Sequence, residues 1–176
     1  GTFLAPAVWD AGTHLLGLAV GDWDRNGSPD LITTNYLSAD VTFLASDERG
    51  GFQAPRQLQS SRQSHAVAEG DWNRDGAPDV VVTNDQGTLS LLLGDGAGGF
   101  QQARLPSVGR SPSAAGTGDW NRDGRTDLAV PNFGNNGVAF LLGDDDAGLR
   151  SVGVAPVGVA PYLVLSQDLN LDGKPD

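Results

Sequence analysis

One acidic motif recurs four times along the chain, and this repetition constrains the fold more than any other feature of the sequence. The copies are GDWDRNGSPDLIT from Gly21, GDWNRDGAPDVVV from Gly70, GDWNRDGRTDLAV from Gly118 and QDLNLDGKPD from Gln167. The first aspartates of consecutive copies are 49, 48 and 49 residues apart. A second marker, GGF, keeps the same period at Phe52 and Phe100. A fixed period of this length indicates a chain built from repeated supersecondary units.

Each repeat has room for four short strands separated by turns. The sequences NDQG and GDGAGG in the second repeat are typical of tight turns and hairpins. The strands that we predict there are His65–Glu69, Asp79–Thr83, Thr88–Leu93 and Phe100–Leu105. Small residues precede the motif at one equivalent position, as expected for an innermost strand where backbones crowd: Ala19, Ala68 and Gly116. Four strands in about 40 to 50 residues is the size of a β-propeller blade.

The predicted fold is therefore all-β, a β-propeller of four-stranded antiparallel blades. About three and a half blades fit in the 176 residues, with repeats at approximately 1–51, 52–99, 100–148 and an incomplete 149–176. We expect an outer strand near Phe3–Val8, three full blades and a last inner strand near Tyr162–Ser166. An open fan of this size leaves sheet edges exposed. We therefore expect either part of a longer propeller or copies that associate through open blade edges.

Oxygen-bearing residues occupy fixed positions in the motif. Counted from the first aspartate, positions 1, 3, 5 and 9 are aspartate or asparagine, and position 6 is always glycine, which permits a sharp turn. Position 7 varies freely, which suggests that only its backbone carbonyl is used. The candidate metal ligands are Asp22, Asp24, Asn26, Ser28 and Asp30; Asp71, Asn73, Asp75, Ala77 and Asp79; Asp119, Asn121, Asp123, Arg125 and Asp127; and Asp168, Asn170, Asp172, Lys174 and Asp176.

The all-oxygen ligand set favours a hard cation, and five or six flexible ligands favour calcium over magnesium. We expect up to four Ca²⁺ ions, one per loop. They would change the formal net charge from −11 to −11 + 8 = −3. A plain aspartate-rich turn without metal is one alternative. An EF-hand is another, but it needs a glutamate at position 12 and a following helix, whereas position 12 is Thr33, Val82 or Val130 in strand-forming sequence.

The stretch GDWNRDGAPDVVVTNDQGTLSLLLGDGAGGF resembles the FG-GAP, or VCBS, repeat family, which includes the propeller head of integrin alpha chains. The asparagine after the second predicted strand fits the same pattern at Asn35, Asn84 and Asn132. The resemblance covers nearly the whole chain. It implies that the aspartate-rich loop joins the first and second strands of a blade and binds calcium. It also implies a seven- or eight-bladed extracellular propeller that recognises proteins or glycans from its opposite face.

The function that we expect is a secreted or cell-surface, non-enzymatic binding module with structural calcium and a protein or glycan ligand. A propeller-type polysaccharide lyase or hydrolase, and a structural module that assembles through blade edges, are the alternatives. No catalytic residue is predicted. The net charge of −11 argues against nucleic acid, and no apolar run approaches the roughly 20 residues of a membrane span.

Several side chains that are not candidate metal ligands have two interpretations. The tryptophans at position 2 could stack on sugars, but their repeat period favours packing between blades; they are Trp23, Trp72 and Trp120. The resemblance places ligand recognition on the loops at the other end of the strands. Those loops carry His14, Tyr36, Arg62, Asp85, Arg110 and Phe133, each of which could equally be solvated surface.

Overall fold

The computed structural model describes residues 8–47, 49–144 and 148–170, and within these ranges it contains twelve strands and no helix. The first sheet contains β1 (Leu15–Gly21), β2 (Asp30–Asn35), β3 (Asp40–Leu44) and β4 (Arg56–Gln59). The second contains β5 (Ser64–Gly70), β6 (Asp79–Asn84), β7 (Thr88–Gly94) and β8 (Phe100–Arg104). The third contains β9 (Gly116–Gly118), β10 (Asp127–Asn132), β11 (Gly137–Gly143) and β12 (Leu149–Pro156).

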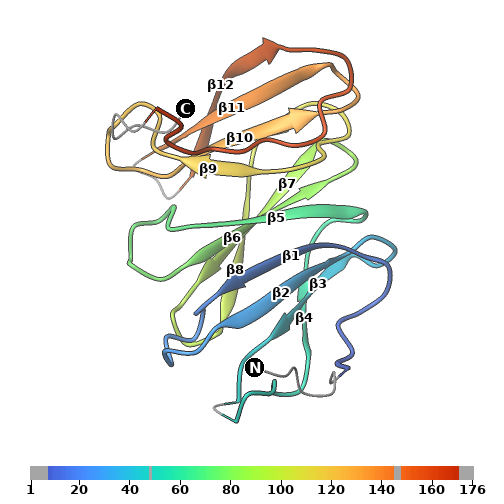
Figure 1. Ribbon diagram of the computed structural model, residues 1–176, viewed down its shortest axis with the longest axis vertical. Helices are drawn as coiled ribbons and strands as arrows, with labels where there is room; N and C mark the ends of the chain where they lie inside the picture. Colours follow the sequence, from blue (N-terminus) through green and yellow to red (C-terminus); the bar gives the residue numbers. More distant parts are fainter. Residues whose placement is uncertain (1–7, 48, 145–147, 171–176) are drawn as a thin grey trace.

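Each sheet is an antiparallel meander in which the strands follow one another in chain order. The three sheets are stacked in sequence order along the long axis of the molecule (Figure 1). The all-β prediction and the four-stranded units are thus confirmed, and the sheets do not close on themselves. All four strands predicted in the second repeat are present, with ends that differ by no more than one residue.

The hydrophobic core lies between the sheets. One cluster joins Trp23 and Phe43 of the first sheet to Val80 and Val82 of β6, and it includes five fully or nearly fully buried side chains from the first sheet and its loops. A second cluster joins Trp72 and Val81 to the third sheet. Strand β6 therefore buries both of its faces, which is why its sequence is a continuous apolar run rather than an alternating one.

The tryptophans confirm this arrangement in two of three cases. Trp23 is fully buried in the cluster between the first and second sheets, and Trp72 is buried between the second and third. Trp120 is only partly buried, and its ring meets Phe140 of the same sheet edge-on with 6.2 Å between ring centroids. Packing between sheets, not sugar stacking, accounts for the first two.

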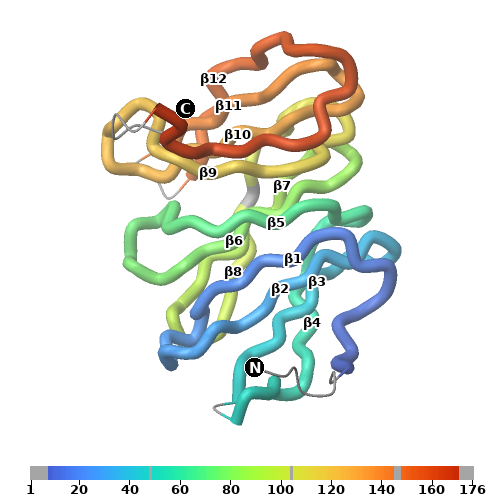
Figure 2. The backbone as a smooth tube through the Cα atoms, viewed as in Figure 1, coloured from blue at the N-terminus to red at the C-terminus, as the bar shows by residue number. Residues whose placement is uncertain are grey.

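The inner strand predicted near Tyr162–Ser166 is wrong as a strand assignment, although its path is close to the expected one (Figure 2). The segment runs alongside β9 and the residues just before it. The Ser113 hydroxyl lies 3.1 Å from the Pro161 carbonyl oxygen, and Gly116 of β9 faces the Val164 side chain. Strands β1, β5 and β9 each pair with the strand that follows their acidic loop. No such strand follows this segment within the described residues, so it has no ladder partner.

The expected outer strand near Phe3–Val8 lies almost wholly outside the described residues, and Val8 itself is not in a strand. The sheets are also offset from the sequence repeats. The GGF marker of one repeat leads into the fourth strand of the preceding sheet, as Phe100 does at the start of β8. The sheets therefore span Leu15–Gln59, Ser64–Arg104 and Gly116–Pro156.

Candidate metal-binding loops

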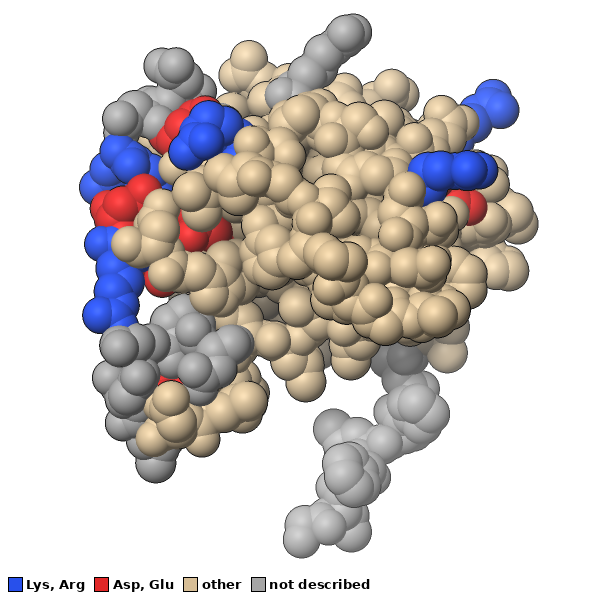
Figure 3. Space-filling model, turned by 90° about the horizontal axis from the view of Figure 1, so that it is seen from above, with Lys and Arg blue, Asp and Glu red and all other residues tan. Residues whose placement is uncertain are grey.

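Three of the four acidic loops are fully described, and each joins the first and second strands of its sheet. The strand pairing closes directly across each loop, between Gly21 and Asp30, Gly70 and Asp79, and Gly118 and Asp127. The loops therefore lie at the same end of the three sheets, where acidic and basic side chains gather side by side on the left of Figure 3.

The three loops share one backbone conformation. The glycine at position 6 has a positive φ of 84° at Gly27, 80° at Gly76 and 79° at Gly124, which explains why no other residue occurs there. The arginine at position 4 also has a positive φ, between 55° and 60°, which is uncommon for a residue with a side chain. This second constraint could not be anticipated from the residue type.

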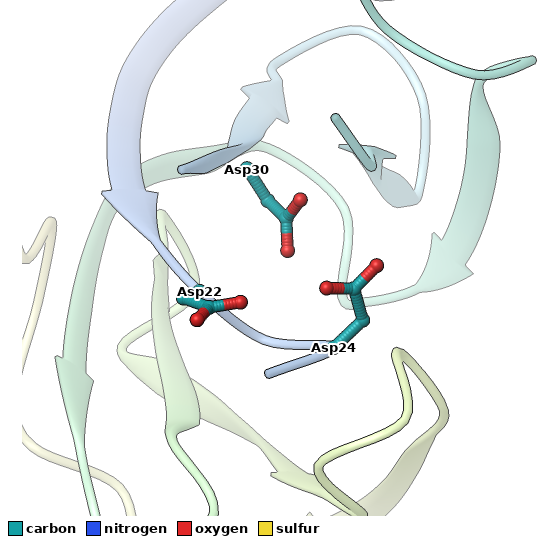
Figure 4. Close-up of side chains that lie close together, drawn as sticks. All are labelled: Asp22, Asp24 and Asp30. Carbon is teal, nitrogen blue, oxygen red and sulfur yellow. The ribbon is translucent and has the colours of Figure 1, made fainter. Parts of the chain in front are cut away.

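In the first loop three carboxylates converge. Asp22, Asp24 and Asp30 each offer an oxygen, and these oxygens all lie within 4.8 Å of one another (Figure 4). Partial burial raises the pKa of Asp24, and the negative charges of Asp30 and Asp22 raise it further. Three like charges at this spacing repel one another, and a divalent cation among them would reverse the sign of that interaction.

The first aspartate of each loop also shapes the backbone. Its Oδ2 accepts a hydrogen bond from the glycine N–H at position 6, at 3.0 Å for Asp22, 3.0 Å for Asp71 and 2.9 Å for Asp119. The other oxygen of Asp71, Oδ1, is buried without a hydrogen-bond partner. A buried, unpartnered carboxylate oxygen is costly unless a cation or water binds it. The second loop thus has a free ligand atom of the type that calcium prefers.

In the second and third loops, the side chain at position 3 forms a hydrogen bond with the side chain at position 5. Asn73 donates to Asp75 Oδ2 at 2.7 Å, and Asn121 donates to Asp123 Oδ2 at 2.9 Å. Desolvation raises the pKa of Asp123, but the hydrogen bonds that it accepts from Asn121 and Arg125 outweigh this effect, and the net result is a lowered pKa. Within the described part of the chain, only the first loop brings three carboxylates within 4.8 Å of one another. All three loops have three aspartates, but the first has one of them at position 3 instead of position 5, where its carboxylate comes close to Asp22 and Asp30.

The position-7 residues donate their N–H groups to the position-5 side chain. The distances are 2.7 Å from Ser28 to Asn26, 2.6 Å from Ala77 to Asp75 and 2.9 Å from Arg125 to Asp123. Of the fourth copy, Asp168 and Asn170 are described, whereas Asp172, Lys174 and Asp176 lie outside the described residues.

The aspartate at position 9 has a role that the sequence did not predict. Asp30, Asp79 and Asp127 are fully buried, and each carboxylate bridges two backbone N–H groups. One belongs to the tryptophan at position 2, at 2.8 Å for Asp79 and Trp72, and the other lies at the end of the third strand, at 2.9 Å for Asp79 and Gly94. Burial raises the pKa of Asp79 despite these hydrogen bonds. Position 9 therefore ties the acidic loop to the far hairpin of its own sheet.

Two glycines of GDGAGG, Gly96 and Gly98, make contacts across the sheet boundary. A Cβ atom added to Gly96 would lie 3.0 Å from Cζ of Arg25, the position-4 arginine of the first loop. The Gly98 N–H donates to the Trp23 carbonyl oxygen at 3.2 Å, and Arg56 Nη1 donates to the Gly98 carbonyl oxygen at 2.9 Å. The turn of the second sheet thus lies directly against the acidic loop of the first, and the positive φ of 69° at Gly96 and 75° at Gly98 favours glycine at both positions.

These observations define a class of repeat protein: four-stranded antiparallel sheets, stacked in chain order, each with an aspartate-rich loop between its first two strands. The family model described as FG-GAP-like repeat matches residues 22–82 and 71–130. These matches cover more than half of the chain, and the chain belongs to the FG-GAP-like repeat family. No curated protein sequence matches it.

One solved structure shows a similar fold at low sequence identity. The structure of BBS1N in complex with ARL6DN superposes with a TM-score of 0.63 and 10% identity, over 89% of this chain and 49% of that chain. This chain therefore spans about half the length of the chain that it matches in that complex. The Tc holotoxin pore of Photorhabdus luminescens matches with a TM-score of 0.46 and 18% identity, over 90% of this chain and 7% of that chain. No helix among the described residues is long and apolar enough to cross a membrane.

Proposed function

We propose that this chain is a calcium-binding β-propeller module that acts outside the cell, without catalysis, in recognition or adhesion, with a protein or glycan as its ligand. The three stacked sheets have the form of propeller blades. FG-GAP repeats are typical of extracellular, non-enzymatic modules, and the family match supports both parts of the proposal. The observation that carries the calcium proposal is the buried, unpartnered Oδ1 of Asp71 inside a loop built the same way three times.

The residues present fit a calcium ion. In the first loop Asp22, Asp24, Asn26 and Asp30 would supply side-chain oxygens, and Ser28 its carbonyl oxygen. The second, third and fourth loops would use the same five positions: Asp71, Asn73, Asp75, Ala77 and Asp79; Asp119, Asn121, Asp123, Arg125 and Asp127; and Asp168, Asn170, Asp172, Lys174 and Asp176. The ion would neutralise the carboxylates and hold the first hairpin of each sheet. Extracellular calcium modules commonly bind with Kd of about 10⁻⁴–10⁻³ M, which suits a location outside the cell.

Thermal unfolding in calcium and in chelator tests this proposal. At about 10 mM calcium the ion is at about 10 to 100 times a Kd of 10⁻³–10⁻⁴ M, which stabilises the native state by about 1.4–2.7 kcal/mol per site, so we expect the melting temperature to rise clearly. Equilibrium dialysis against millimolar calcium, followed by elemental analysis, should find more calcium on the protein side than in the buffer. Asp71→Asn should lower the amount of bound calcium, and magnesium at the same concentration should stabilise less. Identical melting in calcium and chelator, with no bound ion, would refute the calcium part.

A second candidate function is self-association through the outer face of β1. Leu16, Leu18 and Val20 are 50%, 60% and 58% exposed. Val67, which occupies the position of Leu18 one repeat later, packs against the first core cluster. A second copy would therefore cover Leu18 with the same kind of contact that the chain makes between its own sheets. Light scattering across a concentration series tests this, and Leu18→Asp should abolish any dimer; a monomer at all concentrations would refute it.

A further inference from the structure

A cluster of polar and aromatic side chains lies at the end of the sheets opposite the acidic loops. Strand β1 starts at this end and finishes at the acidic loop, about 20 Å away for seven extended residues (Figure 1). The Tyr36 hydroxyl donates to Asp85 Oδ2 at 3.2 Å, and Gln63 Nε2 donates to the Tyr36 hydroxyl at 3.3 Å. These contacts join the first and second sheets, because Tyr36 follows β2 and Asp85 follows β6.

Both histidines of the chain belong to this cluster. The His65 ring meets Tyr36 edge-on at 5.2 Å, and the His14 ring is tilted against Tyr36 at 5.6 Å. His65 Nε2 lies 3.1 Å from Asp85 Oδ1, but it is buried and has no partner in hydrogen-bond geometry. The cluster thus combines a carboxylate, an amide, a phenol and two imidazoles, of which one imidazole nitrogen is not satisfied within the protein.

The backbone of this end repeats, whereas the side chains of the cluster do not. One hydrogen bond recurs in all three sheets: the N–H of Tyr36 donates to His14, that of Asp85 to Gln63 and that of Phe133 to Ser111, at 3.2, 3.1 and 3.0 Å. The three acceptor residues share a positive φ between 48° and 60°. The same backbone therefore forms with tyrosine, aspartate or phenylalanine at one position. The fold does not require the Tyr36, His65 and Asp85 combination, which points to a role of these side chains in binding.

The chemistry of the cluster fits sugar hydroxyl groups. Carboxylate, amide and imidazole groups exchange hydrogen bonds with hydroxyls, and aromatic rings pack on the C–H face of a sugar. The Asp85 and His65 side chains remain 27% and 22% exposed, and His14 is exposed. His65 also forms part of the wall of a hollow of about 290 Å³ that Leu16, Tyr162 and other inner residues line. Exposed Arg62 and Arg110 in the adjoining loops make a cationic ligand unfavourable here.

We propose that the cluster formed by Tyr36, His65 and Asp85, with His14 and Gln63 at its border, is a glycan-binding site. This inference rests on the proposed recognition function and assigns its ligand class and its location. Asp85 would accept hydrogen bonds from ligand hydroxyls while the Tyr36 hydroxyl holds its carboxylate in place, and the unpartnered Nε2 of His65 would bond to the ligand. The His14 ring would provide an exposed stacking surface. The site uses side chains from two sheets, so a correct sheet-to-sheet arrangement is a condition for binding.

The test uses the whole chain in calcium and a panel of defined oligosaccharides of neutral hexose and of hexuronate units. We expect at least one to bind, and to shift the NMR signals of both histidines, which are the only histidines in the chain. Asp85→Asn removes the charge at nearly constant shape, and we expect it to weaken binding about tenfold or more. His14→Ala should weaken binding by removing the stacking surface.

Phe133→Ala is the matched control, because Phe133 is 50% exposed at the same repeat position one sheet later. It should bind as the unaltered chain does. The calcium-dependent melting temperature of each variant reports the proposed module function separately from glycan binding. The inference is wrong if no oligosaccharide binds, or if Asp85→Asn and His14→Ala bind as tightly as the unaltered chain. This holds even where calcium stabilises the protein. Binding of a peptide at the histidines, without any glycan, would also overturn it.

Discussion

Replacing Asp79 with alanine should destabilise the protein even when no calcium is present. The fully buried Asp79 carboxylate accepts backbone N–H groups from Trp72 at 2.8 Å, Gly94 at 2.9 Å and, at a long 3.4 Å, Asn73. Alanine would leave two well-bonded N–H groups without an acceptor, at about 1–3 kcal/mol each. Removal of a buried negative charge offsets part of this loss. We therefore expect the free energy of unfolding to fall by about 2–4 kcal/mol.

The assay is urea unfolding in excess chelator, followed by tryptophan fluorescence, with Asp75→Ala as the matched control. Asp75 is an exposed residue of the same loop, and its bonds are to neighbouring residues of that loop. In chelator Asp75→Ala should change the free energy of unfolding by less than about 1 kcal/mol. In calcium both variants should lose metal-dependent stability. Equal destabilisation by the two variants in chelator would refute the structural role assigned to position 9.

Three further changes test other parts of the structure. Trp23→Ala should lower the free energy of unfolding by about 3–5 kcal/mol, because Trp23 is fully buried between two sheets. Trp120 is partly exposed, so Trp120→Ala should lower the free energy of unfolding clearly less in the same urea assay. Gly87→Ala should cost about 2 kcal/mol or more in that assay, because φ is 78° and a Cβ atom would overlap the Gly109 carbonyl oxygen. Hydrogen bonds from the backbone N–H groups of Ala97 and Gly99 lower the pKa of Asp95. The ionised Asp95 therefore stabilises the fold above about pH 4, and this stabilisation is lost as the pH falls through the lowered pKa. Asp95→Asn should make the free energy of unfolding depend less on pH between about pH 5 and 2.

The fold was largely predictable because each repeat carries its own local signals. The turn sequences and the apolar runs fixed the strands of the second repeat to within one residue at each end. The period then carried the assignment to the other repeats. It also placed Trp23 and Trp72 between sheets, since residues that keep the repeat period meet equivalent surroundings. The same reasoning failed near Tyr162–Ser166, because a strand also needs a ladder partner, and none follows within the described residues.

The candidate sites were less predictable, for two physical reasons. An aspartate at position 9 looks the same in sequence whether it binds an ion, two backbone N–H groups or both, so the role of Asp79 was hidden. The Tyr36–Asp85 hydrogen bond joins residues 49 positions apart. Both follow the repeated asparagine, and residues at one repeat position of adjacent sheets lie near each other. That signal was available, but the distance between the two side chains depends on how the sheets stack.

The chain-order stacking of the sheets has a consequence for synthesis on the ribosome. Every strand of one sheet emerges before any strand of the next, so each sheet can form its own ladders as soon as its fourth strand has left the exit tunnel, after Gln59 for the first sheet. The buried side chains, however, lie between sheets rather than within them. The first sheet therefore gains its apolar partner only once β6 and β7 have emerged, near residue 94. Nascent chains shorter than this should be protease-sensitive, and protection should appear in steps of one repeat, each delayed by one repeat behind translation.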